Sequence, residues 1–333
     1  MELVVGTTTL DLSNADIDGL DHLIVSSDGT TTFGLVTLGD GGDNAINAGR
    51  ALDVDSGSGG IVVTDDITTN NDSTDDGGDI VLVGDEVVLN DTADNAVEIN
   101  TNDATTDGSL TVTTTNPIRS TVAWRDGLTL DIGDSSIDLR NASIQLDHLN
   151  VRADVVSLGD TTVGAGNVDG ALGIEALRVD ATTTLNLYGD IDMTGEGDAG
   201  DINFAGTADI ALMDDGADND GVVTLTTDGT TDQSVSIGVA VDDGTEGLGF
   251  TITAGTGQIT LTGAVGSAAA PDDPIGALTL IGGTVDIDAD IDAAGITVTG
   301  TTIDVDSANN GVRIDSEGGT LAFASNTIDI RTA

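Results

Sequence analysis

Apolar residues recur along this chain as pairs that are separated by a single residue. In the last quarter of the chain the pairs are Phe250/Ile252, Ile259/Leu261, Leu278/Leu280, Val285/Ile287, Ile296/Val298, Ile303/Val305, Val312/Ile314, Leu321/Phe323 and Ile328/Ile330. A period of two residues is typical of a strand that buries one face. The residue inside each pair is mostly Thr, Asp or Ala, and Gly, Asp, Asn and Ser fill the intervals between pairs, as turns require. The pattern therefore predicts many short strands joined by tight turns.

Strands of this length are stable only beside other strands. Two architectures accept them, a β-sandwich or a string of sandwiches, and a parallel β-helix. We favour the parallel β-helix, because the strand spacing predicts about 20 residues per three-strand coil. Small aliphatic side chains also suit a narrow interior in which like residues stack between coils. The predicted fold is thus all-β, a parallel β-solenoid with about three short strands per coil.

The chain repeats itself about every 125 residues. Residues 50–56 return as residues 175–181 and again as residues 301–307, at offsets of 125 and 126 residues. Shorter matches are Leu20-Asp21-His22-Leu23 with Leu146-Asp147-His148-Leu149, and Gly78-Asp79-Ile80 with Gly200-Asp201-Ile202. We predict one continuous solenoid over residues 1–333, made of tandem copies at approximately 1–127, 128–255 and 256–333, the last of them partial. Six coils per copy follow from about 20 residues per coil.

A chain that copies a large unit is building length rather than one catalytic pocket. The partial third copy leaves two interpretations open. The chain is an excerpt of a longer repeat array, or it is a subunit whose open end meets the next subunit.

Charge narrows the classes of partner. The chain carries 59 acidic and eight basic residues, a formal net charge of −51, and all eight basic residues are arginine. Such a charge opposes binding to nucleic acid and to anionic membranes, and it favours cations, basic surfaces or a high-salt medium. The apolar fraction of 38% favours a folded chain over a disordered one. With no cysteine, disulfides are excluded.

No apolar run is long enough to cross a bilayer, and the first residues lack the basic and apolar regions of a signal peptide. We therefore expect no membrane insertion.

Two segments resemble a known family. Residues 255–266, Gly-Thr-Gly-Gln-Ile-Thr-Leu-Thr-Gly-Ala-Val-Gly, and residues 275–280, Ile-Gly-Ala-Leu-Thr-Leu, are similar to repeats of filamentous-haemagglutinin-like surface proteins. Residues 200–206 are similar too. The resemblance covers the chain in pattern and implies a right-handed parallel β-helix, secretion, and a role in adhesion, matrix or fibre formation. It carries over no functional residue.

Acidic turns are the best candidates for chemistry. The two densest contain the candidate calcium ligands Asp214, Asp215, Asp218 and Asp220, and Asp75, Asp76 and Asp79. Hard oxygen ligands on flexible glycine turns suit Ca²⁺, which is the one cofactor that the sequence suggests. Neither turn has the spacing of an EF-hand or of a calcium β-roll. The alternative is a solvated acidic surface with diffuse cation screening.

Other polar residues are expected to be structural. His22 and His148 occupy matched repeat positions, and about six coils, or roughly 30 Å, would separate them along a solenoid. That separation excludes one shared metal site. Asp286, Asp288, Asp290 and Asp292 alternate with other residues, and we interpret them as the outer face of a strand.

These observations favour a protein that is not an enzyme. A polysaccharide lyase on this fold needs a basic catalytic residue and a positive groove, whereas this chain has no lysine. We predict an extracellular or cell-surface structural and adhesive β-solenoid, a rod or fibre-forming segment. Two alternatives are a filament subunit that stacks end to end, and a calcium-dependent module that binds carbohydrate or protein. The expected partners are further copies of the chain, end to end or laterally, and a surface carbohydrate or protein.

Overall fold

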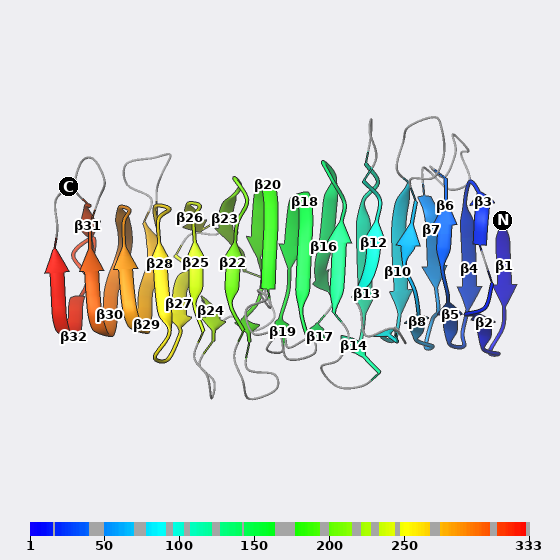
Figure 1. Ribbon diagram of the computed structural model, residues 1–333, viewed down its shortest axis with the longest axis horizontal. Coiled ribbons are helices and arrows are strands. Elements are labelled where there is room, and N and C mark those ends of the chain that lie inside the picture. Colours follow the sequence, from blue (N-terminus) through cyan, green and yellow to red (C-terminus); the bar gives the residue numbers. More distant parts are fainter. Residues whose placement is uncertain are drawn as a thin grey trace. The chain divides into compact units, whose positions relative to one another are not determined.

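The structure, a computed structural model, consists of short strands and turns (Figure 1). It describes residues 1–15, 17–39, 50–69, 78–90, 96–102, 107–121, 127–141, 143–163, 177–193, 200–214, 221–227, 233–243, 247–266, 274–306 and 312–330. No helix occurs among these residues, and so none that could cross a membrane. The chain forms two compact units, unit 1 with residues 1–159 and 167–171, and unit 2 with residues 160–166 and 172–333.

Unit 1 contains three ladders of parallel strands, and each coil gives one strand to each ladder. The first ladder is β1 (Glu2–Val5), β4 (Leu23–Ser27), β7 (Arg50–Asp55), β10 (Asp79–Gly84), β13 (Leu110–Thr114), β16 (Ser136–Asn141) and the second half of β18 (Leu149–Leu158). The second is β2 (Leu10–Leu12), β5 (Thr31–Phe33), β8 (Ile61–Val63), β11 (Val87–Leu89), β14 (Ile118–Ser120) and β17 (Ile144–Leu146). The third is β3 (Ile17–Leu20), β6 (Val36–Leu38), β9 (Ile67–Thr68), β12 (Val97–Asn100), β15 (Leu128–Asp131) and the first half of β18.

Unit 2 has the same construction, but several of its strands are long enough to serve two ladders. One ladder is β19 (Thr161–Val163), β21 (Ile191–Asp192), β24 (Val222–Thr226), β27 (Gly249–Thr253), β29 (Ile275–Ile287), β30 (Ile291–Val305) and β32 (Leu321–Ile330). A second runs from β20 (Leu177–Leu187) through β22 (Ile202–Phe204), β25 (Val235–Ile237) and β28 (Gln258–Leu261) to the later halves of β29, β30 and β32. The third joins β20, β23 (Asp209–Leu212), β26 (Val241–Asp243), a bridge at Val265, the start of β30 and β31 (Ile314–Asp315).

Within each unit this arrangement confirms the predicted parallel β-helix of three strands per coil. The predicted coil length, however, is wrong. In unit 2 the register runs from Leu177 to Ile303 in five steps, through Ile202, Val235, Ile259 and Val285. The repeat period therefore holds five coils rather than six. The predicted length rested on the last quarter of the chain, which contains the shortest of these five steps, from Val285 to Ile303. The step from Ile191 to Leu225 is almost twice as long.

The two histidine motifs are not structurally equivalent, which corrects the expectation from the repeat. Leu23, which follows His22, lies in the first ladder of unit 1, where it pairs with Leu52. Leu149, which follows His148, lies in the third ladder and pairs with Leu128. The sequence match is thus displaced to another ladder, because coils of unequal length shift the phase. The prediction of one continuous solenoid with three tandem copies stays a prediction.

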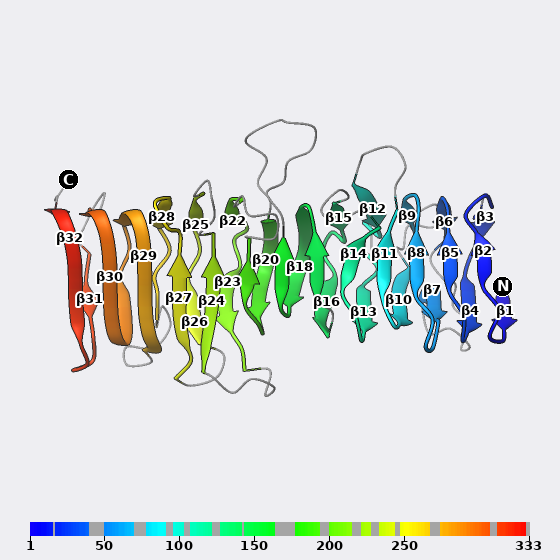
Figure 2. The ribbon, with the colours of Figure 1, turned by 90° about the horizontal axis from the view of Figure 1, so that it is seen from below.

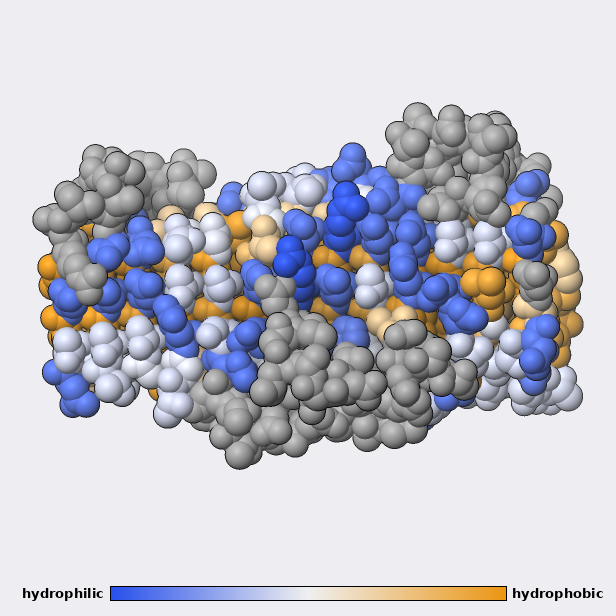
Figure 3. Space-filling model, in the orientation of Figure 1, coloured by the Kyte–Doolittle hydropathy of each residue, from blue (hydrophilic) through white to orange (hydrophobic). Residues whose placement is uncertain are grey.

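The core of each unit consists of stacked aliphatic side chains. In unit 2 one stack is Val223, Phe250, Leu278 and Ile296, which are neighbours in register on successive strands and are all at most 3% exposed. Outward positions carry polar residues, and Figure 3 shows orange apolar positions between pale and blue outward ones. Burial of these stacks, which removes apolar surface from water, is the main stabilising contribution.

Candidate functional site

Most of the predicted calcium ligands lie outside the residues that the structure describes. Asp75, Asp76, Asp215, Asp218 and Asp220 lie outside the described residues. Asp214 is exposed just beyond β23. Asp79 begins β10, and its Oδ1 accepts hydrogen bonds from the Ser109 N–H at 2.7 Å and from the Ser109 hydroxyl at 2.8 Å. The described part of the chain brings together no group of three or more His, Asp or Glu side chains that could hold a metal ion, and calcium binding stays a prediction.

The hydrogen bond of Asp79 recurs at five other aspartates, and we call all six the corner aspartates. Each is the residue before an inward-facing strand position, and its Oδ1 accepts the backbone N–H of the residue in register one coil further on. The corner aspartates are Asp66, Asp79, Asp160, Asp190, Asp201 and Asp290, and they accept from Glu98, Ser109, Asp190, Thr224, Ser234 and Arg313 at 2.7–3.1 Å. These six aspartates therefore tie one coil to the next.

The chemistry of these contacts explains why aspartate stands at the corners. A backbone N–H near a turn still needs an acceptor, because an unpaired one destabilises the fold. The short carboxylate side chain supplies a charge-assisted hydrogen bond, which is stronger than a neutral one. The repeated sequence Gly-Asp-Ile at residues 78–80 and 200–202 marks two of these corners. The repeat thus marks two structural aspartates, a role that the sequence analysis did not predict.

Removal of one corner aspartate tests this role. We expect Asp201→Ala to lower the free energy of unfolding by about 1–2 kcal/mol, because the Ser234 N–H loses its charged acceptor. Asp201→Asn should recover about half of the loss, since its amide oxygen still accepts. Urea denaturation followed by circular dichroism measures both. The control is Asp209→Ala, at an exposed position of β23. An equal loss in the control variant would contradict the structural role.

The histidines lie apart, as expected. His22 directly precedes β4, and His148 directly precedes β18. Four to five coils lie between these two positions. The two histidines are therefore about 20 Å apart along the stack. The His148 Nδ1 atom lies 3.2 Å from Oδ2 of Asp147, whose side chain is 1% exposed. The His148 ring also covers Gly127 so closely that an added Cβ would clash with it. His148 is therefore a packed corner residue.

The four aspartates from Asp286 to Asp292 were expected on the outer face of one strand, but they do not all lie there. Asp286 lies on the outer side of β29, where it pairs in register with Asp304. Asp288 follows the strand, and its pKa is raised to about 6 by burial, by the Asp286 charge and by a side-chain hydrogen bond with Asp306. Asp292 is only 7% exposed and bonds Arg313 at 3.2 Å. The prediction is wrong for Asp292, because the chain turns at Asp290 and the alternation ends there.

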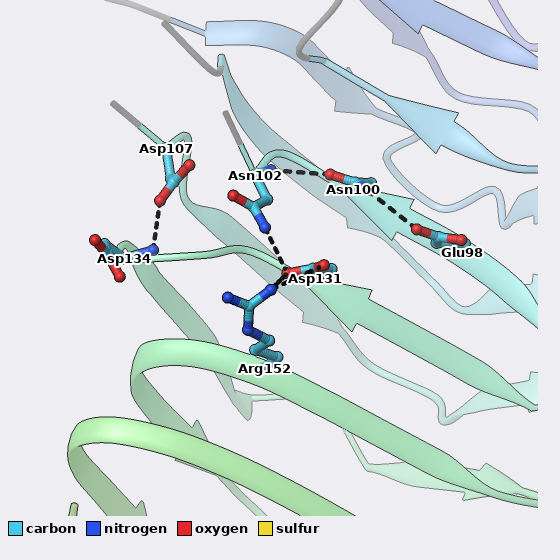
Figure 4. A network of polar contacts seen from close by, with 7 residues as sticks. All are labelled: Glu98, Asn100, Asn102, Asp107, Asp131, Asp134 and Arg152. Atoms are coloured by element: carbon cyan, nitrogen blue, oxygen red, sulfur yellow. Dashed lines mark hydrogen bonds and ion pairs between the residues drawn. The ribbon is translucent and has the colours of Figure 1, made fainter. Parts of the chain in front are cut away.

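Arginines act as links within the acidic surface. In Figure 4, Asp131 on β15 accepts hydrogen bonds from Asn102 at 3.1 Å and from Arg152 on β18 at 3.3 Å. Similar ion pairs join Arg119 to Glu86 and Arg313 to Asp292. These arginines neutralise neighbouring carboxylates.

One face of unit 2 differs from the acidic surface and was not foreseen. It is formed by β24, β27, residues 277–281 of β29 and residues 295–299 of β30, neighbours in one ladder (Figure 2). Its outward positions form two rows. The first row is Thr224, Thr251, Thr279 and Thr297, and the second is Thr226, Thr253, Ile281 and Thr299. We call these eight residues the threonine face.

The threonine face is regular and uncharged. Neighbouring threonines of a row are about 4.8 Å apart, and the two rows are about 6.7 Å apart. The four strand segments contain no charged residue, whereas the next ladder carries Asp286, Asp304 and Asp329 at consecutive positions. Each segment reads Thr-apolar-Thr, or Thr-apolar-Ile in β29. That signal is in the sequence, but only the register between coils shows that the threonines align.

No protein-family model, curated protein or solved structure matches this chain.

Proposed function

We propose that this chain is a non-enzymatic structural and adhesive β-solenoid that works at a cell surface or in an extracellular matrix, and that it adheres through the threonine face. The observation that supports the proposal is the uncharged, regular array of threonines on a chain whose net charge is −51. The resemblance to filamentous-haemagglutinin-like surface proteins points in the same direction.

The absence of charged residues from the threonine face makes it the most suitable contact surface. A carboxylate brought against another surface loses hydration, and this loss is unfavourable without a cationic partner. The threonine face avoids that cost, because its groups are hydroxyls and methyls. Each hydroxyl both donates and accepts hydrogen bonds, and the methyl groups and Ile281, which is 38% exposed, add apolar contact area.

The chemistry of the face selects a class of partner. A flat row of hydroxyl and methyl groups complements a neutral polymer that presents hydroxyl groups at regular intervals beside apolar ring faces. A neutral polysaccharide has this character. We therefore propose that a neutral polysaccharide is the ligand, and that many weak contacts along the array add up to useful affinity.

Charged substitutions on the threonine face test this proposal. We expect the variant Thr251→Asp/Thr297→Asp to bind cellulose particles at least tenfold more weakly than the unmodified chain, because two carboxylates would have to be desolvated. Depletion from solution measures binding. The matched control is Ser236→Asp/Gln258→Asp, which adds the same charge at exposed positions of the neighbouring ladder. Absence of binding by the unmodified chain, or equal weakening by both variants, would contradict the proposal.

A further inference from the structure

The side chains of the threonine face are restricted in conformation, yet their hydrogen-bonding groups are available. All eight residues, seven threonines and Ile281, are β-branched, so each side chain has few rotamers on its strand. The seven threonine hydroxyls make no hydrogen bond to any residue that the structure describes. The face therefore presents methyl and hydroxyl groups at fixed positions, and the hydroxyls bond to whatever lies against them.

The strand register makes the threonine face periodic in two directions. Its four strand segments run side by side in Figure 2 and keep one register throughout. Neighbours along a row are about 4.8 Å apart, and neighbours across the two rows are about 6.7 Å apart. A single polymer chain is periodic in one direction only. A ligand that matches both spacings at once is therefore a surface with its own two-dimensional order.

Size and charge narrow the choice of ligand. The array spans roughly 14 Å along its rows and about 7 Å across them, which is far smaller than the ~800 Å² that each partner buries in a stable protein complex. The face has no charged residue, whereas the next ladder stacks Asp286, Asp304 and Asp329. The ligand is thus an uncharged and ordered surface. Ice has this character, and repeat distances between oxygen atoms on its crystal faces lie close to both spacings of the array.

We infer that the threonine face binds ice. Methyl groups restrict the orientations of the water molecules around them, and a hydroxyl donates and accepts hydrogen bonds as a water molecule does. Water above the face is therefore held at the spacings of the ladder, in an arrangement that continues into an ice surface. The inference goes beyond the proposed function, because it adds a ligand of another kind and holds whether or not the face binds polysaccharide.

The acidic ladder beside the threonine face limits how the chain meets the crystal. Its carboxylates are hydrated in liquid water, and enclosing them in ice costs that hydration. A chain that is attached through the threonine face keeps these carboxylates on the liquid side. It therefore stays at the crystal surface, where it slows the addition of further water and changes the shape of the growing crystal.

Partition of the full chain into slowly grown ice tests the inference. We expect the unmodified chain to be enriched in the ice fraction at least tenfold over the variant Thr251→Asp/Thr297→Asp, because the added carboxylates would have to be desolvated. The control Ser236→Asp/Gln258→Asp adds the same charge on the neighbouring ladder and should be enriched like the unmodified chain. Exclusion of the unmodified chain from ice, or equal loss in the two variants, would overturn the inference.

Two uncharged variants separate ice binding from polysaccharide binding. Thr251→Val/Thr297→Val keeps the methyl groups and removes the hydroxyls, whereas Thr251→Ser/Thr297→Ser does the reverse. We expect the valine variant to keep more than half of its enrichment in ice and the serine variant to lose it at least fivefold, because the methyl groups order the water.

Cellulose binding should change in the opposite order, since the hydroxyls make the directional contacts with a polysaccharide. Circular dichroism checks that both variants are folded. A serine variant that binds ice as well as the valine variant would overturn the inference. A chain that binds cellulose but not ice would overturn only the inference, whereas one that binds ice but not cellulose would overturn only the proposed adhesive function.

Discussion

Replacement of Phe250 by alanine is expected to lower the free energy of unfolding by about 3–5 kcal/mol. The Phe250 side chain is fully buried in β27, where it stacks between Val223 of one coil and Leu278 of the next. Removing the ring deletes a large apolar surface and leaves a cavity, because the two neighbouring coils are fixed by their ladder hydrogen bonds and cannot close around the gap. Few side chains of this core are as large, since the chain has only four phenylalanines.

Urea denaturation monitored by circular dichroism measures this effect, and Phe323→Ala is the matched control. Phe323 lies in the same ladder, on β32, but is only partly buried, so its removal should shift the urea midpoint by less than half as much. Equal shifts for the two variants would show that the described burial does not control stability.

The alternation of apolar residues was sufficient to predict the class of fold. Pairs such as Ile303/Val305 have one buried residue on each side of an outward Asp304, and that period admits only a strand. The coil length was not predictable in the same way. It depends on how many polar residues each corner holds, and the coil from Val285 to Ile303 is far shorter than the coil from Ile202 to Val235. The two-residue period of apolar positions within a strand gives no information about the length of the turns between strands.

The functional surface was harder to predict, because it depends on the register between coils. Thr279 is adjacent in the ladder to both Thr251 and Thr297, although the sequence interval to Thr251 is much the longer of the two. No single sequence period links them. The acidic residues show a related difficulty. Asp79 and Asp201 stand out as conspicuous charges in sequence, yet each serves the backbone of the next coil. Composition alone cannot separate a carboxylate that binds an ion from one that binds an N–H group.

Replacement of Gly266 by alanine is expected to lower the free energy of unfolding by roughly 2–5 kcal/mol, from two separate causes. Gly266 has φ of +72°, a left-handed conformation that favours glycine. An added Cβ would also clash with the carbonyl oxygen of Asp292 in the next coil. The backbone at Asp292 cannot move away easily, because two hydrogen bonds hold it. Its N–H donates to the Val265 carbonyl at 2.7 Å, and its carboxylate accepts a hydrogen bond from Arg313.

A second glycine separates the two causes. Gly221 has φ of +69°, but no described atom lies within 4 Å of the position of its added Cβ. Gly221→Ala should therefore show only the cost of the left-handed conformation, about 1–2 kcal/mol. The remaining loss in Gly266→Ala measures the close approach of successive coils, and urea denaturation of both variants gives it by difference. If both variants lost the same stability, the coils would not be in contact at Gly266. A larger loss at Gly266 would mean that close stacking of the backbone, together with the buried apolar ladders, limits which residues the corners of this solenoid accept.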